Sequence, residues 1–189
     1  MLALTITWQS ARTRAMSIAS SLMLLVASIF SLMPARAYAL PDCATTSTNG
    51  SGCRIKTAAA GNRCLDATGG VLDGAPMELF DCLTVATHPN QRFLFDPVPG
   101  HSGYYRLRFP GWSYCLSGLG TTLAVQSCRL NTEGSWQWWK MVPSGSNNFQ
   151  LKLYYDGKCA DASNGGTANG TPIIKYACLS GHVNQLWTL

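Results

Sequence analysis

Three segments of the chain share one order of residues, and this internal repeat limits the possible folds more than any other feature. Each segment opens with a cysteine-led tetrad and continues to a second cysteine. A glutamine follows, with an aromatic residue two positions beyond it. The glutamine recurs after 46 and then 48 residues, at positions 91, 137 and 185. The segments are Cys64-Leu65-Asp66-Ala67, Cys82 and Gln91-Arg92-Phe93; Cys115-Leu116-Ser117-Gly118, Cys128 and Gln137-Trp138-Trp139; and Cys159-Ala160-Asp161-Ala162, Cys178 and Gln185-Leu186-Trp187.

Short strands separated by turns are expected within each repeat. A strand-like stretch closed by glycine precedes each first cysteine, and pairs such as Asp73-Gly74 and Asn169-Gly170 are typical of turns. No stretch keeps an apolar period of 3.6 residues, so helix content should be low. Units of about 45 residues are too small to bury a core alone. We therefore expect one all-β domain whose three repeats, at about 53–97, 98–142 and 143–189, share a closed, three-fold barrel.

Residues 1–39 differ from the rest of the chain and have the order of a secretory signal peptide. Arg12 and Arg14 precede an apolar run from Met16 to Met33, and Ala37-Tyr38-Ala39 supplies the small residues of a cleavage site. A membrane anchor is the alternative reading, since the run approaches the roughly 20 residues that span a bilayer. Serines dilute the run, which favours the signal. Residues 40–52 would form an N-terminal extension, and the true start is Met1 or Met16.

Net charge and cysteine count exclude some partners and indicate disulfide bonds. The predicted leader holds three of the 14 basic residues, so 11 basic and 9 acidic residues remain. A net charge of +2 from scattered residues gives no basic patch for nucleic acid. All eight cysteines lie after the leader, and an even number in an exported chain indicates disulfides. Zinc is disfavoured because no pair has C-x₂₋₄-C spacing. We expect no metal and no cofactor.

The repeated motifs resemble those of the ricin B-type lectin family. The resemblance rests on Q-x-W at Gln137/Trp139 and Gln185/Trp187, on the Q-x-F variant at Gln91/Phe93, and on the C-L-D-A and C-A-D-A tetrads. It covers roughly residues 53–189. It implies a β-trefoil of twelve strands with pseudo-three-fold symmetry and three sugar-binding subdomains, α, β and γ, one for each repeat in chain order.

The resemblance also implies one disulfide inside each subdomain. Together with the even cysteine count and the register of the repeats, this leaves one N-terminal pair. The expected disulfides are Cys64–Cys82, Cys115–Cys128, Cys159–Cys178 and Cys43–Cys53.

A shallow sugar site needs a carboxylate for the hydroxyls, an aromatic ring for the apolar face and an amide. In the family these groups are the tetrad aspartate, an aromatic residue shortly before the second cysteine, and the asparagine before the Q-x-W glutamine. A further polar contact lies two residues before the aromatic. By resemblance, the candidate carbohydrate-binding residues are Asp66, Glu78, Phe80 and Asn90 in α, and Asp161, Tyr176 and Asn184 in γ.

The β subdomain departs from this pattern at every position. Ser117 replaces the acid, Gln126 the aromatic and Trp136 the amide, so we expect no sugar site of this kind there. In γ, Ile174 stands where α has Glu78, which puts the orientation of a γ ligand in question.

Several residues have structural interpretations. A tetrad aspartate could simply cap a turn. Large aromatics that recur once per repeat suit a shared core, with the glutamines satisfying buried backbone groups. Trp138 should face outward because it alternates with its neighbour along a strand. The three histidines are expected in surface loops, and His182 is a candidate to line the γ site. The predicted structural core residues are Gln91, Phe93, Gln137, Trp139, Gln185 and Trp187.

The sequence thus predicts a secreted lectin, extracellular or periplasmic, that binds a galactoside or a xylan-type glycan. It has no P-loop, G-x-S-x-G or H-E-x-x-H motif, and the trefoil leaves no room for a catalytic domain, so we do not expect an enzyme. No segment after Leu40 is apolar for long enough to insert into a membrane. Two alternatives remain: a cell-binding or substrate-targeting subunit of a secreted toxin or hydrolase on another chain, and a β-trefoil protease inhibitor.

Overall fold

The structure is a computed structural model that describes residues 52–59, 61–83, 88–129, 133–145 and 147–189. The predicted signal peptide (1–39) and nearly all of the predicted extension (40–52), including Cys43, lie outside the described residues. Within the described ranges the chain forms one 12-stranded sheet. The strands are β1 (Lys56–Thr57), β2 (Arg63–Ala67), β3 (Met77–Asp81), β4 (Leu94–Pro97), β5 (Tyr105–Arg108), β6 (Tyr114–Ser117), β7 (Ala124–Ser127), β8 (Trp138–Ser144), β9 (Asn148–Leu153), β10 (Cys159–Ala162), β11 (Thr171–Tyr176) and β12 (Trp187–Thr188).

Helical structure in this part of the chain consists of 3₁₀ turns of three residues each. Three of them hold the repeated glutamine, and the fourth follows the third tetrad. They are η2 (Pro89–Gln91), η3 (Ser135–Gln137), η4 (Ser163–Gly165) and η5 (Val183–Gln185).

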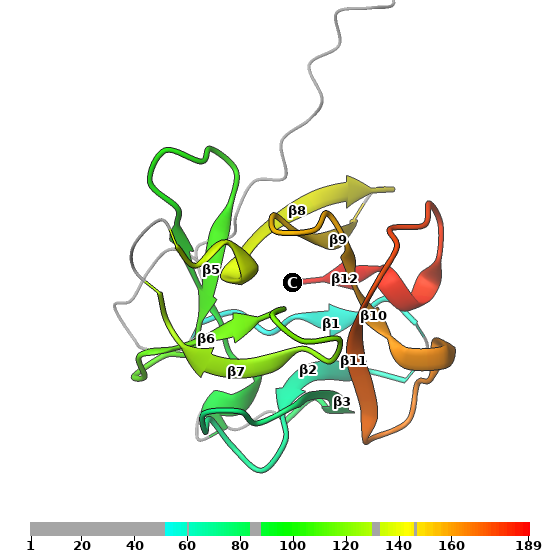
Figure 1. The fold of residues 1–189 in the computed structure, drawn as a ribbon. Helices are drawn as coiled ribbons and strands as arrows, with labels where there is room; N and C mark the ends of the chain where they lie inside the picture. Colours follow the sequence, from blue (N-terminus) through cyan, green and yellow to red (C-terminus); the bar gives the residue numbers. More distant parts are fainter. Residues whose placement is uncertain (1–51, 60, 84–87, 130–132, 146) are drawn as a thin grey trace, which may run out of the picture. The chain divides into compact units, whose positions relative to one another are not determined.

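Two strands from each repeat close a ring. Strand β1 pairs with β12, β12 with β9, β9 with β8, β8 with β5, and β5 with β4. A bridge between Cys53 and Phe93 joins β4 back to the start of the first repeat. The short β12 and the chain end lie near the centre of the view in Figure 1. A ring of this kind leaves no open sheet edge along the barrel wall.

The remaining strands form three hairpins, β2–β3, β6–β7 and β10–β11, one for each repeat. The first strand of each hairpin carries at least the first three residues of a cysteine-led tetrad. The hairpins also contact one another: β3 pairs with β11, Pro76 bridges Ala124, and Thr122 bridges Ile174. Six ring strands and three mutually bridged hairpins confirm the predicted β-trefoil with three repeats (Figure 1).

The repeats bury their apolar residues in one shared core. The Q-x-W aromatics Phe93, Trp139 and Trp187 are among its largest fully buried side chains. Phe93 packs on Phe109 with ring centroids 4.9 Å apart. The indole nitrogens of the two tryptophans donate to the backbone oxygens of Leu116 and Ala160, at 3.0 and 3.3 Å. These rings therefore fill the core and satisfy their polar atoms there.

The three predicted disulfides inside the repeats are present. Cys64–Cys82, Cys115–Cys128 and Cys159–Cys178 each have a Cα–Cα distance of 5.0 Å. Each bond joins the first strand of a hairpin to the chain just beyond its second strand. Cys53 is disulfide-bonded as well, and its pairing with Cys43 stays a prediction.

The prediction that Trp138 faces outward into solvent is wrong. Its side chain is 2% exposed, because residues from two other segments cover the outer face of β8. The ring centroids of His101 and Tyr154 lie 4.5 and 5.2 Å from that of Trp138, and the guanidinium carbon of Arg106 lies 5.9 Å away. His101 lies in the loop between β4 and β5, as expected, and is half-buried there because its ring packs on Trp138.

Candidate functional site

The γ repeat holds a hollow of about 370 Å³ beside its β10–β11 hairpin. Asp161 comes from β10, Tyr176 from the end of β11 and Asn184 from η5. These three residues come from three elements of one repeat and line one space. The lining is completed by Asn164, Gly165, Ile174, Leu179 and His182.

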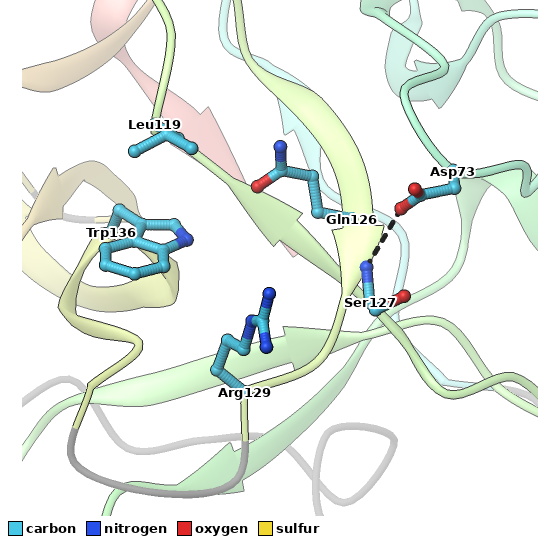
Figure 2. Close-up of a pocket in the computed structure, with 6 residues that line it drawn as sticks. All are labelled: Asp73, Leu119, Gln126, Ser127, Arg129 and Trp136. Carbon is cyan, nitrogen blue, oxygen red and sulfur yellow. Dashed lines mark hydrogen bonds between the residues drawn. The ribbon is translucent and has the colours of Figure 1, made fainter.

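The β repeat has a smaller hollow of about 160 Å³, which differs in composition (Figure 2). Gln126 and Trp136 occupy the repeat positions of Tyr176 and Asn184. Ser117, at the position of Asp161, is 1% exposed and does not line the hollow. The lining consists of Asp73, Leu119, Gln126, Ser127, Arg129 and Trp136.

The γ carboxylate is oriented by two amides. Asn184 Nδ2 donates to Oδ1 of Asp161 at 2.8 Å, and Gln185 Nε2 donates to Oδ2 at 2.8 Å. An ionised carboxylate offers about four acceptor positions. One position on each oxygen is therefore left for a ligand hydroxyl. The side chain is 4% exposed, so protein surrounds it except where it borders the hollow.

The α carboxylate has the same partners in a tighter arrangement. Asn90 Nδ2 donates to both oxygens of Asp66, at 3.0 and 2.9 Å, and Gln91 Nε2 donates to Oδ2 at 2.7 Å. Burial raises the pKa of Asp66, although the bonds from Gln91 and Asn90 lower it; the negative charge of Glu78 raises it further and His88 lowers it. The carboxyl group is thus more readily protonated than a free aspartate.

The other predicted α residues lie on the same hairpin face. Glu78 is directly opposite Asp66 in the β2–β3 register, and Phe80 is opposite Cys64. Cross-strand partners share a face of the sheet, so Glu78 and Phe80 flank the carboxylate along β3. In γ the corresponding partners are Ile174 opposite Asp161 and Tyr176 opposite Cys159. Tyr176 is 52% exposed.

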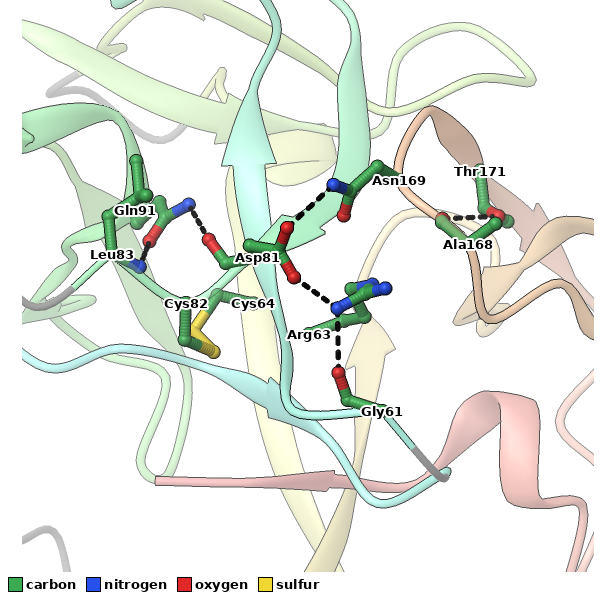
Figure 3. Close-up of polar contacts among 10 residues, drawn as sticks. All are labelled: Gly61, Arg63, Cys64, Asp81, Cys82, Leu83, Gln91, Ala168, Asn169 and Thr171. Carbon is green, nitrogen blue, oxygen red and sulfur yellow. Dashed lines mark hydrogen bonds and ion pairs between the residues drawn. A yellow bond between two sulfur atoms is a disulfide. The ribbon is translucent and has the colours of Figure 1, made fainter.

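All three Q-x-W glutamines make one repeated contact, here called the glutamine clamp. In each repeat the side-chain amide spans the second cysteine: Nε2 donates to the backbone oxygen before it, and Oε1 accepts the backbone N–H after it. Figure 3 shows the α clamp beside the Cys64–Cys82 disulfide. The partners are Asp81 and Leu83 for Gln91, both at 2.9 Å; Ser127 and Arg129 for Gln137, at 3.0 and 2.8 Å; and Ala177 and Leu179 for Gln185, both at 2.8 Å.

In α and γ the clamp nitrogen also donates to the tetrad aspartate, which links the structural contact to the candidate site. In β the third tetrad residue is Ser117, and its hydroxyl bonds other partners than the clamp glutamine. Ser117 Oγ donates to Gln126 Oε1 at 2.7 Å and accepts the N–H of Leu119 at 3.3 Å. The β clamp therefore closes the loop without orienting a carboxylate.

A family model described as a ricin-type beta-trefoil lectin domain matches residues 51–187. The chain belongs to this ricin-type β-trefoil lectin family. Its β-trefoil is a carbohydrate-binding module. No curated protein matches the chain.

Solved structures with the same β-trefoil include a designed three-fold symmetric protein, ThreeFoil, at 25% identity and a TM-score of 0.60, over 71% of this chain and 94% of that one. The C-half of an earthworm R-type lectin, solved with GalNAc, is 16% identical with a TM-score of 0.55, over 71% and 95%. The Haemophilus ducreyi cytolethal distending toxin is 15% identical with a TM-score of 0.61, over 82% of this chain and 88% of that one. At 16% and 15% identity, the similarity to the earthworm lectin and to the toxin shows a shared fold.

Sequence reasoning missed several residues that line the lectin's hollows. Asn164 and Gly165 have φ values of +55° and +67°, and this left-handed turn brings them beside Asp161. Their place directly after the tetrad was the available signal. Arg129 and Asp73 were missed because Arg129 follows a cysteine in an otherwise atypical repeat and Asp73 comes from the neighbouring repeat. His182, which was a candidate, does line the γ hollow.

The described residues contain no group of three or more histidine, cysteine or acidic side chains that could hold a metal ion. In the same ranges, no helix has the length and apolar character needed to cross a membrane.

Proposed function

We propose that the mature chain is a secreted lectin whose α and γ repeats each bind a sugar residue. The single observation that carries this proposal is the pair of buried carboxylates, Asp66 and Asp161. Each is held by an asparagine and a glutamine beside an aromatic residue. The β repeat keeps the fold and lacks the carboxylate. The GalNAc complex of the earthworm lectin supports a sugar as the ligand class.

In the γ repeat, two adjacent ligand hydroxyls donate to the free positions on the Asp161 oxygens. Asn184 Nδ2 uses one hydrogen on Asp161, so its second hydrogen is available to a ligand oxygen. Tyr176 packs on the apolar C–H face of the ring. Bonds to a charged acceptor contribute about 1.5–3 kcal/mol each, so the carboxylate contributes most of the polar recognition.

In the α repeat the same roles fall to Asp66, Asn90 and Phe80, with Glu78 as an additional acceptor. Asp66 already accepts three hydrogen bonds and so retains fewer free positions than Asp161. Glu78, half-buried and opposite Asp66, supplies the acceptors that Asp66 has used. The two sites then differ in how a sugar is oriented, not in whether hydroxyls are bound.

Export is part of the proposal. The predicted signal peptide ends at Ala39, and disulfides persist in oxidising compartments. Amino-terminal sequencing of the exported protein should begin at Leu40 or within a few residues of it. Recovery of Met1 or Met16 from a membrane fraction would instead support the anchor.

A glycan array with the mature chain tests the ligand class, and titration calorimetry with the best neutral glycan tests the number of sites. We expect about two sites per chain, and tighter retention on a repeated glycan because both sites can engage it together. Absence of binding to any neutral glycan would refute the lectin proposal. One site, or three, would refute the assignment to α and γ.

A second candidate function is cell binding for a partner toxin chain. The specific observation is the likeness to the Haemophilus ducreyi toxin, since the likeness covers 88% of the matched toxin chain. Affinity capture from the secreting cell's culture medium distinguishes the candidates. A stoichiometric protein partner supports a toxin or hydrolase subunit, and a chain recovered alone supports a free lectin.

A further inference from the structure

The β hollow contains more hydrogen-bond donors than acceptors, unlike the γ hollow. Figure 2 shows the Arg129 side chain rising from the end of β7 into the space beside Trp136, with the indole nitrogen of Trp136 turned toward the same space. Arg129 is exposed. The three ion pairs found among the described residues do not involve it. Its guanidinium can therefore bind a ligand without breaking an internal contact.

Of the side-chain acceptors that border this space, Gln126 Oε1 is engaged, whereas the Asp73 carboxylate uses one acceptor position and lies to one side of the space. Gln126 Oε1 accepts from Ser117 Oγ at 2.7 Å, which leaves the Nε2 hydrogens of Gln126 as donors. The Asp73 carboxylate lies on the far side of Ser127 from Trp136 (Figure 2), and its Oδ1 accepts the Ser127 N–H at 3.1 Å. A ligand group placed between Arg129 and Trp136 thus meets a cation and N–H donors.

The residues of the β repeat that replace those lining the γ hollow supply hydrogen-bond donors where γ supplies a carboxylate acceptor. Asp161 and Asn184 of γ become Ser117 and Trp136, and Leu179, which lines the γ hollow, becomes Arg129. A guanidinium presents a planar fork that matches a carboxylate through two parallel hydrogen bonds. The indole supplies a flat face on which a sugar ring can pack. The hollow of about 160 Å³ is roughly ten times the 10–15 Å³ that one buried water needs. A sugar ring with its substituents has about as many non-hydrogen atoms as that number of waters, so the hollow has room for one.

We propose that the β hollow is a separate binding site for a saccharide that carries a carboxylate, such as a uronic acid. The carboxylate pairs with Arg129, the ring packs on Trp136, and Gln126 Nε2 donates to a ring substituent. This goes beyond the proposed binding of neutral sugar hydroxyls by α and γ, and neither proposal depends on the other.

The test is titration of the mature chain with glucuronic acid, glucose and acetate, followed by NMR or calorimetry. Glucuronic acid should bind about tenfold more tightly than glucose at this hollow, and raised ionic strength should weaken it. Acetate at the same concentration should not compete, since it lacks the ring. Equal binding of glucose and glucuronic acid would overturn the proposal, as would full competition by acetate.

Arg129→Gln removes the charge at an exposed position and should reduce glucuronic acid binding about tenfold. Arg129→Lys keeps the charge but loses the fork, and should give an intermediate affinity. Lys140→Gln removes an exposed cation elsewhere and should change nothing. Glucuronic acid binding that is unchanged in Arg129→Gln would overturn the proposal.

The failure of this inference is distinguishable from that of the proposed function. Arg129→Gln should retain the neutral glycan found on the array, because that glycan binds at α and γ. A chain that binds glucuronic acid through Arg129 but no neutral glycan would support the β site and refute the proposed sugar binding by α and γ. The reverse pattern would refute the β site alone.

Discussion

In the γ repeat the third tetrad residue is Asp161, held by Asn184 and Gln185, whereas in the β repeat the same position is Ser117, which donates to Gln126. The two repeats otherwise share a hairpin, a disulfide, a buried tryptophan and a glutamine clamp. The comparison separates two sets of residues. The shared set builds the β-trefoil, and the set that differs carries the binding chemistry.

The α repeat has the same aspartate, aromatic residue and asparagine as γ, but the surroundings of its aspartate differ. Asp66 receives three hydrogen bonds where Asp161 receives two, and Glu78 faces Asp66 where Ile174 faces Asp161. Two sites with the same three groups are therefore not copies of each other. Variants at matched positions of the three repeats should therefore affect stability and sugar binding differently.

The largest effect should come from the residues that β and γ share. Trp139→Ala and Trp187→Ala should each lower the free energy of unfolding by about 3–5 kcal/mol, the usual cost of removing a buried tryptophan. Urea denaturation measures this. Because both rings lie in one core, similar losses are expected. A loss confined to Trp187→Ala would show that the β repeat does not contribute to the shared core.

The next effect concerns binding and should differ between the repeats. Asp161→Asn keeps the shape of the side chain and removes the charge, so it should weaken sugar binding at γ by about 1.5–3 kcal/mol, or roughly tenfold or more. Ser117→Ala should leave sugar binding unchanged. Calorimetry with the array glycan measures both, and circular dichroism checks the fold. Greater damage from Ser117→Ala than from Asp161→Asn would reverse the assignment.

The clamp glutamines should separate stability from binding. Gln137→Leu leaves a buried N–H and a carbonyl oxygen without their partner, which should cost about 1–3 kcal/mol of stability, with no change in neutral sugar binding. Gln185→Leu should cost a similar amount and also weaken the γ site, because Gln185 orients Asp161. Thermal unfolding measures the stability of the two variants, and calorimetry measures their sugar affinity. Equal sugar affinity in both variants would contradict the link between clamp and carboxylate.

Much of this fold could be predicted from the sequence, because repetition makes each motif a check on the others. The tetrad and clamp positions recur in register, so the three-fold β-trefoil and the three disulfides followed from spacing together with the family resemblance. Trp138 could not be placed in the same way. Strand alternation indicates which face it points to, but not that His101 and Tyr154 come from other segments to cover that face.

The candidate site was predictable where one repeat supplies all its groups and not where two repeats contribute. Asp161, Tyr176 and Asn184 belong to one motif and line one hollow. The β hollow joins Asp73 of the first repeat to Arg129 of the second. No spacing rule inside a repeat connects these residues, because the contact arises from how neighbouring hairpins pack.

The smallest expected effect is a pH dependence of the α repeat. Burial raises the pKa of Asp66 above its ordinary value of 3.8, so between these two values the folded chain binds more protons than the unfolded chain. Stability contributed by Asp66 is then present below the ordinary value and is lost as the pH rises through the raised pKa. Asp66→Asn cannot ionise and should show a flatter stability profile over that interval, measured by urea denaturation at several pH values.

Sugar binding at α should show the opposite trend and weaken as the pH falls, because the protonated carboxyl group accepts hydroxyl hydrogen bonds less strongly. A profile for the native chain that matches Asp66→Asn throughout would contradict the raised pKa, and α binding that strengthens in acid would contradict the role of the carboxylate.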